Sequence, residues 1–216
     1  MLGRLARVLV AASLIGLVAP LSALANTQPA PIPLDDYVVS ANFSFQSGGT
    51  TWSGIAQIED ERISGVRSAS FFFDGSGSSK SCDAGTPSDP SDDYVGTQLI
   101  EFFSTSTSIK SLTLANDLSS GGFDVALTGR EVTTDACTGE IIRSRADKHR
   151  FKIDLAGVTF PVSQTATYLV TTPEGTFRVT KTVTLVGATG TATIDNQPAT
   201  VDYAVFQHLV QTVAPA

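Results

Sequence analysis

Apolar and polar residues alternate along most of the chain after residue 36. The first clear example places Tyr37, Val39, Ala41, Phe43 and Phe45 on one face, with mainly serine, asparagine and glutamine on the other. A period of two residues with a polar opposite face is typical of a half-buried β-strand. The sequence therefore predicts a strand that begins at Tyr37.

Similar patterns recur to the end of the chain, and none shows a convincing helical period of 3.6 residues. Further strands are expected at residues 51–59, 62–73, 94–104, 108–115, 160–171, 176–186, 191–195 and 200–210, with two more within residues 122–157. Ten to twelve such strands predict an all-β protein, either an antiparallel β-sandwich, of which the jelly roll is one form, or a closed barrel. We expect one domain over residues 37–212.

Two segments interrupt the alternation. Residues 74–93 contain mostly glycine, serine, proline and aspartate, which predicts a long irregular loop. The acidic run Glu59-Asp60-Glu61 predicts a solvated turn.

The first 25 residues have the pattern of a secretory signal peptide. Arg4 and Arg7 precede an apolar run over residues 8–18, and Ala23-Leu24-Ala25 matches the small-residue cleavage pattern. The apolar run is too short to cross a bilayer of about 30 Å as a helix. We therefore expect cleavage after residue 25, a proline-rich leader at 26–36, and a secreted or periplasmic protein without a transmembrane segment in the mature chain.

The charge balance is acidic and argues against nucleic acid as a partner. Removal of Arg4 and Arg7 with the signal peptide changes the formal net charge from −7 to −9. Proteins that bind nucleic acid contact phosphates through basic surfaces, which this composition does not favour. We therefore expect an extracellular ligand or protein as the partner.

The chain has two cysteines, Cys82 and Cys137. In an exported protein such a pair is expected to form a disulfide. The chain-entropy model assigns a stabilisation of about 4 kcal/mol to a cross-link over this separation.

Basic residues cluster in residues 143–152. Arg143 and Arg145 lie two positions apart, as do Arg150 and Lys152, so each pair shares one face of a strand. A hairpin turning through Ala146-Asp147 would place all four on one face. Guanidinium groups bind carboxylate, sulfate or phosphate, which makes this face a candidate anion site. The alternatives are an exposed face balanced by nearby acids, or pairing with the acidic loop.

The irregular loop is the candidate cation site, because oxygen ligands on a flexible loop suit calcium. No other cofactor is indicated. The candidate calcium ligands are Asp74, Asp83, Asp89, Asp92 and Asp93. Ser79 and Gly85 stand where a helix–loop–helix calcium site requires glycine and glutamate, so a site here would be non-standard.

The sequence contains no recognised catalytic motif, and we assign no catalytic residue. The favoured interpretation is a non-catalytic exported protein that binds a ligand or partner through loops and the basic face. One alternative is a structural or assembly protein of the cell surface that pairs through strand edges or its leader. Another is a secreted hydrolase that uses carboxylates, for which Glu101 in an apolar strand is the residue of interest.

Overall fold

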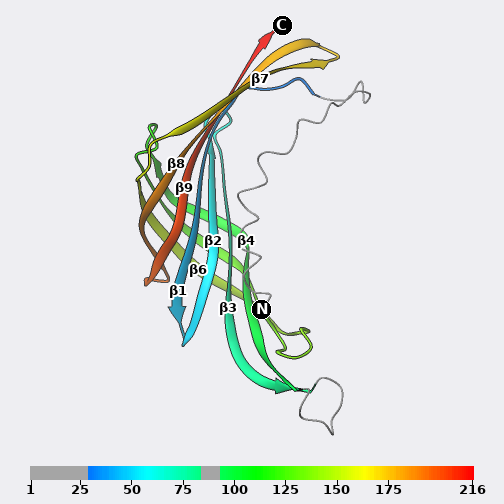
Figure 1. The fold of residues 1–216 in the computed structure, drawn as a ribbon, viewed down its shortest axis with the longest axis vertical. Coiled ribbons are helices and arrows are strands. Elements are labelled where there is room, and N and C mark those ends of the chain that lie inside the picture. Colours follow the sequence, from blue (N-terminus) through cyan, green and yellow to red (C-terminus); the bar gives the residue numbers. More distant parts are fainter. Residues whose placement is uncertain (1–28, 84–92) are drawn as a thin grey trace.

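The computed structural model describes residues 29–83 and 93–216, and these ranges form nine strands (Figure 1). The predicted signal peptide lies outside the described residues. The strands are β1 (Leu34–Ser47), β2 (Thr50–Glu61), β3 (Val66–Cys82), β4 (Tyr94–Leu114), β5 (Ser120–Thr134), β6 (Ile141–Gly157), β7 (Val162–Thr172), β8 (Gly175–Ile194) and β9 (Gln197–Pro215). The all-β, antiparallel prediction is confirmed.

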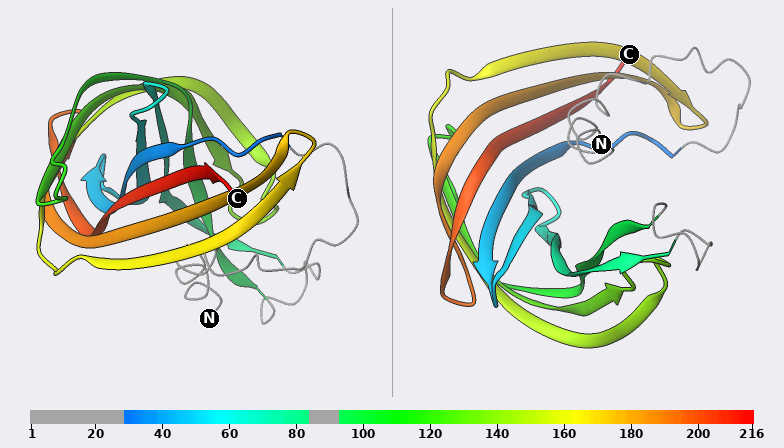
Figure 2. Two further views of the ribbon diagram at one scale, coloured as in Figure 1. Left: turned by 90° about the horizontal axis from the view of Figure 1, so that it is seen from above. Right: turned by 60° about the horizontal axis from the view of Figure 1, so that its bottom comes forward.

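The strands form one sheet that closes on itself. Its order is β6-β5-β4-β3-β2-β1-β9-β8-β7, and β6 also pairs with β8 through residues 151–157 and 188–194. Figure 2 shows the strands curving around a common interior. Because neighbours in the chain are neighbours in the sheet, short turns suffice for most connections.

Alternation places one row of side chains from each strand in that interior. The buried core contains aromatic residues from six strands of the ring, and five of them, Phe43, Phe73, Phe102, Phe151 and Phe206, are at most 2% exposed. Burial of a large apolar side chain stabilises a fold by about 1.5–3 kcal/mol, so this aromatic cluster is a principal source of stability.

The strands are fewer and longer than the pattern indicated. Residues 94–104 and 108–115 were expected as two strands and form the single strand β4, with shifts of register at Ser104/Ser106 and Ile109/Ser111. The predicted strands 176–186 and 191–195 likewise form the single strand β8, with a shift between Ala188 and Thr191. Bulges interrupt the alternation without ending the backbone ladder, which explains the difference.

Three local predictions were wrong. The hairpin through Ala146-Asp147 does not exist, because β6 is continuous and pairs with β5 on both sides of these residues. The first part of the expected loop, residues 74–82, belongs to β3 and pairs with β4. Residues 59–61 belong to β2, and Asp60 is buried.

The sheet splits between β3 and β4 at one end. The two strands pair only from Phe72/Phe103 to Cys82/Tyr94, so residues 66–71 of β3 and 104–114 of β4 diverge. The Ser104 hydroxyl bridges to the backbone of Phe71, and the Thr107 hydroxyl donates to the carbonyl oxygen of Ala69. Beyond these bridges no backbone pairing joins β3 to β4 as far as the β2–β3 and β4–β5 turns.

The ordered sheet begins slightly earlier and ends slightly later than the predicted domain, at Leu34 and Pro215. Within the described residues there is no helix long and apolar enough to cross a membrane.

Candidate functional site

The four basic residues predicted to form one anion site lie on opposite faces of β6. Arg143 and Arg145 belong to the row that continues into buried Phe151, and therefore face the concave side. Arg150 and Lys152 belong to the other row and face outward. Because β6 is continuous, its odd-numbered and even-numbered side chains point to opposite faces and cannot contact one ligand from the same side.

Most of this positive charge is already paired. Arg150 makes a two-point contact with Asp124 at 2.9 and 2.6 Å, and Lys152 lies 3.6 Å from the same carboxylate. The hydrogen bond from Arg150 is the main reason that the pKa of Asp124 is lowered. On the other face Arg145 contacts Glu131 at 2.8 Å.

Arg143 has no ion pair in the described part of the chain. A shallow pocket of about 220 Å³ beside Lys152 also contains Asp124 and Asp154, so its carboxylates disfavour an anion. The predicted basic face is therefore not assembled.

The candidate calcium ligands that the structure describes do not form one group. Asp89 and Asp92 lie outside the described residues. Asp74 is on the outer face of β3, directly opposite Glu101 of β4, whereas exposed Asp93 accepts a hydrogen bond from the hydroxyl of Ser81 at 3.4 Å. Among the described residues, which include Asp83, no group of three metal-ligating side chains is found. Calcium binding stays a prediction.

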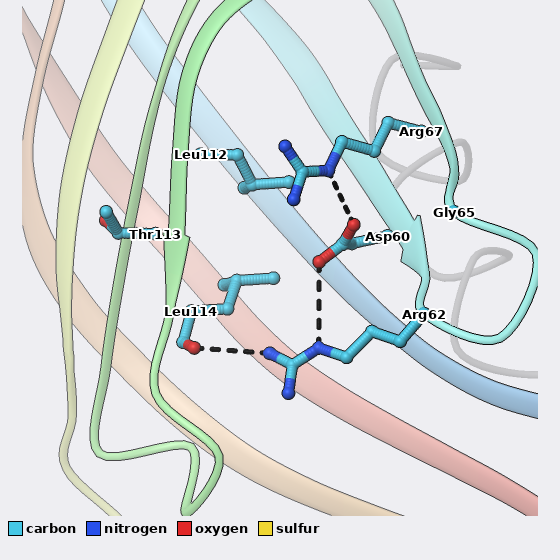
Figure 3. A pocket seen from close by; sticks show the side chains of 7 residues that line it. All are labelled: Asp60, Arg62, Gly65, Arg67, Leu112, Thr113 and Leu114. Carbon is cyan, nitrogen blue, oxygen red and sulfur yellow. Dashed lines mark hydrogen bonds and ion pairs between the residues drawn. The ribbon is translucent and has the colours of Figure 1, made fainter.

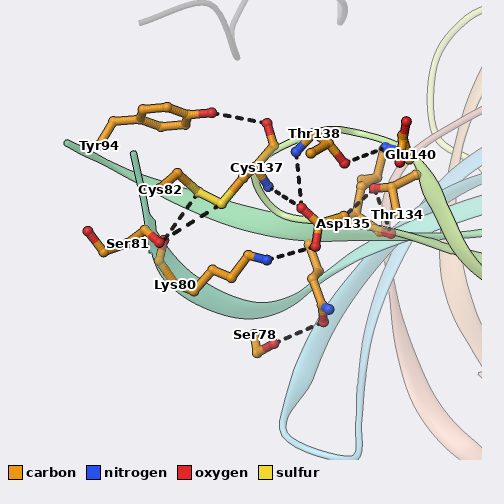
Figure 4. Close-up of polar contacts among 12 residues, drawn as sticks. Ser78, Lys80, Ser81, Cys82, Tyr94, Thr134, Asp135, Cys137, Thr138 and Glu140 are labelled. Carbon is orange, nitrogen blue, oxygen red and sulfur yellow. Dashed lines mark hydrogen bonds and ion pairs between the residues drawn. A yellow bond between two sulfur atoms is a disulfide. The ribbon is translucent and has the colours of Figure 1, made fainter. Parts of the chain in front are cut away.

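The predicted disulfide is present between Cys82 and Cys137, with Cα atoms 5.5 Å apart. It ties the end of β3 to the β5–β6 turn (Figure 4). Lys80 contacts Asp135 at 2.7 Å across the same junction, and the Tyr94 hydroxyl donates to the carbonyl oxygen of Cys137 at 3.0 Å. The hydrogen bond from Lys80 and those from two turn amides lower the pKa of Asp135 far below its usual range.

An open pocket of about 640 Å³ fills the gap between the diverging parts of β3 and β4 (Figure 3). It is lined by Asp60, Arg62, Gly65, Arg67, Leu112, Thr113 and Leu114. The β2–β3 turn forms its rim, where Gly65 adopts a φ of +71° that disfavours other residues. Glu61 fixes this turn by accepting hydrogen bonds from the backbone amides of Ile63 and Ser64.

Asp60 stands between the two arginines of the pocket. Its carboxylate lies 2.7 Å from Nε of Arg67 and 3.7 Å from Nε of Arg62. Only 7% of Asp60 is exposed, so its charge is buried and requires such partners. The two guanidinium groups and one carboxylate leave the pocket lining with a formal charge of +1.

Arg62 is held from several directions. Its terminal nitrogens donate to the carbonyl oxygen of Leu114 at 3.3 Å and to Oδ1 of Asn116 at 2.5 Å, so it bridges the gap that the missing β3–β4 ladder leaves. Its guanidinium also lies 3.7 Å from the ring centre of Tyr37. The imidazole of His208 stacks on the same ring at 3.9 Å, and spacings this short place the two groups on opposite faces of the ring.

Arg67 is the less constrained arginine. Its Nε contacts Asp60, whereas its two terminal nitrogens have no partner in the part of the chain that the structure describes. About half of the side chain is exposed. In Figure 3 its guanidinium lies between Asp60 and Leu112, so its free donors face the pocket. Arg67 can therefore offer a two-point contact to an anion.

No local sequence pattern predicts this pocket. Arg62 and Arg67 were assigned to an ordinary strand, and the leucines lie 45 or more residues further along the chain. Their proximity depends on the register of three strands and on the split between two of them, and neither leaves a local signal. The one available sign was the acidic run before Arg62, which places a carboxylate beside two arginines.

The two histidines have structural partners. His149 contacts Asp195 at 2.6 Å and lies edge-on to Phe73 and Phe102. His208 contacts Asp35 at 2.6 Å, beside the stacked ring of Tyr37. These contacts join β6 to the β8–β9 turn and β9 to β1.

Comparisons with known proteins add no assignment, because no protein-family model, curated protein or solved structure matches the chain.

Proposed function

We propose that this protein is an exported, non-catalytic binding protein whose ligand is a small amphipathic carboxylate. The ligand occupies the gap between β3 and β4. The observation that carries the proposal is the guanidinium of Arg67, held by buried Asp60 at 2.7 Å while its terminal nitrogens face a pocket of about 640 Å³.

The charged end of the pocket suits a single carboxylate. Arg62 and Arg67 exceed the charge of Asp60 by one, and Asp60 fixes the orientation of Arg67 before a ligand arrives. A preoriented guanidinium loses less conformational freedom when it binds than a freely rotating one does. Because guanidinium groups remain protonated at physiological pH, this arrangement is suited to hold an anion rather than to transfer a proton.

The remaining lining suits a short apolar chain. Leu112 and Leu114 project from β4 opposite Arg67, and both contact the hydrophobic core from the edge of the gap. Small-molecule sites usually have volumes of about 300–1,000 Å³ and combine apolar walls with a few polar anchors. A carboxylate with a chain of roughly eight carbons can contact Arg67 with its charged group and the two leucines with its apolar chain.

Export is supported by the disulfide between Cys82 and Cys137, since such bonds persist in oxidising compartments. It also agrees with the signal-peptide pattern of residues 1–25.

Titration calorimetry with octanoate and with neutral octanamide tests the proposal. We expect octanoate to bind more tightly, and Arg67→Gln to weaken octanoate binding about 10- to 100-fold, the usual effect of losing a charge-assisted hydrogen bond. Arg143→Gln is the matched control, because it removes an exposed arginine outside the pocket, and it should leave binding unchanged. Equal affinity for acid and amide, no binding of octanoate, or a normal affinity in Arg67→Gln would contradict the proposal.

A further inference from the structure

β7 forms an unprotected edge of the sheet. All eleven of its residues, Val162–Thr172, pair with β8, and no other described strand pairs with it. β7 lies with the last part of β9 at the top of Figure 1, and in the order of the sheet β1, β9 and β8 separate it from β2 and the pocket. Its second side therefore presents backbone amide and carbonyl groups of an extended strand.

The composition of β7 is unusual for such an edge. Its sequence, VSQTATYLVTT, contains no charged residue and no proline, and its pairing with β8 has no bulge. Natural sheets protect exposed edges with charges, prolines or bulges, and an edge without them accepts another strand. A free edge at residues 141–150 of β6, by contrast, carries Arg143, Arg145, Lys148 and Arg150 and is protected in this way.

We propose that β7 pairs with β7 of a second copy of this chain, as antiparallel neighbours related by a two-fold axis. This surface is separate from the pocket, and the inference does not depend on the proposed ligand. Identical strands that meet antiparallel are self-complementary, and an axis at Thr167 keeps all eleven residues in register. The pairing joins two sheets into one continuous sheet.

One face of β7 carries hydroxyl groups that already form a ladder with β8. Hydroxyl pairs join Ser163 to Thr184 at 2.8 Å, Thr165 to Thr182 at 2.9 Å, Thr167 to Thr180 at 3.0 Å and Thr171 to Thr176 at 3.2 Å. With the axis at Thr167, that residue meets itself and Ser163 meets Thr171 of the second copy. Hydroxyl pairs thus recur across the junction at these positions, with an interruption where Thr165 meets Leu169, because hydroxyls donate and accept equally well.

The opposite face of β7 provides large and small side chains in complementary order. Tyr168 is 46% exposed, and the same register places it opposite Ala166 of the second copy. Val162 is 60% exposed and meets a threonine. Aromatic and branched side chains stabilise antiparallel pairs by about 0.2–1 kcal/mol each when they face across the ladder.

The absence of charge in β7 favours a second copy over a foreign strand. A binding edge that selects a different partner normally uses complementary charges to reject others. β7 offers no charge for such selection, and it meets no repulsion when it faces its own copy. Its specificity rests on matched length, with Pro161 and Pro173 ending the pairing on both sides.

Sedimentation velocity of the mature protein tests the inference. We expect the protein to be dimeric at a concentration of about 100 µM. Thr167→Lys brings two like charges together at the axis and should produce a monomer with a nearly unchanged melting temperature. The control is Thr191→Lys on the outer face of β8, where the residue is exposed and already lies between β6 and β9; it should remain a dimer. A monomeric wild type, or a dimeric Thr167→Lys, would overturn the inference.

The register is tested by cysteine substitution and mild oxidation. Thr167→Cys should form an intermolecular disulfide, because the residue faces itself across the axis. Thr165→Cys should not, because it faces Leu169 of the second copy. Efficient cross-linking through residue 165 in place of 167 would refute the proposed pairing.

Discussion

Asp36 is a buried carboxyl group on the outer face of β1, and its replacement gives the sharpest test of the electrostatics of this fold. It is 8% exposed, and its Oδ1 atom is buried without a hydrogen-bond partner in the described structure. Glu61 of the neighbouring strand β2 lies directly opposite Asp36, and Glu59 of β2 lies diagonally across from it. Burial first, and then repulsion by and hydrogen bonding with Glu59, raise the pKa of Asp36 to about 6.

The raised pKa fixes the sign of the pH dependence. Between pH 3.8 and about 6 the folded protein holds the proton more tightly than the unfolded chain does. The free energy of unfolding therefore decreases as the pH rises through this window, and the full penalty is present above pH 6. Asp36 thus destabilises the fold at neutral pH and is relieved when it is protonated.

The magnitude follows from the size of the shift. A change from 3.8 to about 6 corresponds to a ceiling of about 3 kcal/mol. Solvent screens charges at the surface of the sheet, so we expect about 1–2 kcal/mol. Asp36→Asn keeps the shape of the side chain, removes its charge and supplies a donor for Glu59. It should raise the free energy of unfolding by this amount at pH 7.5.

Urea denaturation at pH 4.5, 6 and 7.5 measures the effect. The gain from Asp36→Asn should be largest at pH 7.5 and clearly smaller at pH 4.5, where the folded protein keeps Asp36 protonated. Asp202→Asn, which changes an exposed carboxylate of β9, is the control and should have little effect at any of these values. A gain from Asp36→Asn that does not change with pH, or a loss of stability at pH 7.5, would refute the reasoning.

Two further predictions concern the opposite end of the sheet and its outer face. Replacement of Cys82 and Cys137 by serine should lower the free energy of unfolding by about 2–4 kcal/mol in urea, whereas unchanged stability would show that the cross-link constrains little. Asp124→Asn should cost about 0.5–1 kcal/mol at pH 7 through loss of its contact with Arg150. Because the pKa of Asp124 is lowered, this cost should shrink as the pH falls toward 3, and a constant cost would contradict it.

The fold class was predictable because the closed part of the sheet has one apolar and one polar face. Phe43 and Phe45 on β1, and Phe151 and Ile153 on β6, show the alternation that burial on one side requires. The disulfide was also predictable, from the number of cysteines and the signal-peptide pattern of residues 1–25. Strand order was not, because it depends on pairings between residues far apart in the sequence.

Strands could not be predicted from the sequence where they extend beyond the closed part of the sheet. Residues 141–148 of β6 are polar or exposed on both faces, so nothing in their pattern distinguished a strand from a turn. Residues 74–82 of β3 are largely glycine and serine, and hydrogen bonds to β4 together with Cys82 hold them in place. Backbone pairing of this kind leaves little trace in hydrophobicity.

The location of the candidate site could not be predicted for a related reason. The sequence drew attention to the densest cluster of basic residues, but a continuous β6 sends Arg143 and Arg150 to opposite faces. The pocket instead combines Arg67 with Leu112, which come together only because β3 and β4 separate. A split in a sheet depends on local bulges and bridging side chains, and these are not evident before the register is known.

The most direct test of the central claim is a crystal structure of the protein with 8-bromooctanoate bound, in which anomalous scattering locates the bromine. We expect the carboxylate on the terminal nitrogens of Arg67 and the bromine beside Leu112 and Leu114, in the gap between β3 and β4. A ligand bound at another place, or a pocket that stays free of ligand at saturating concentration, would contradict it.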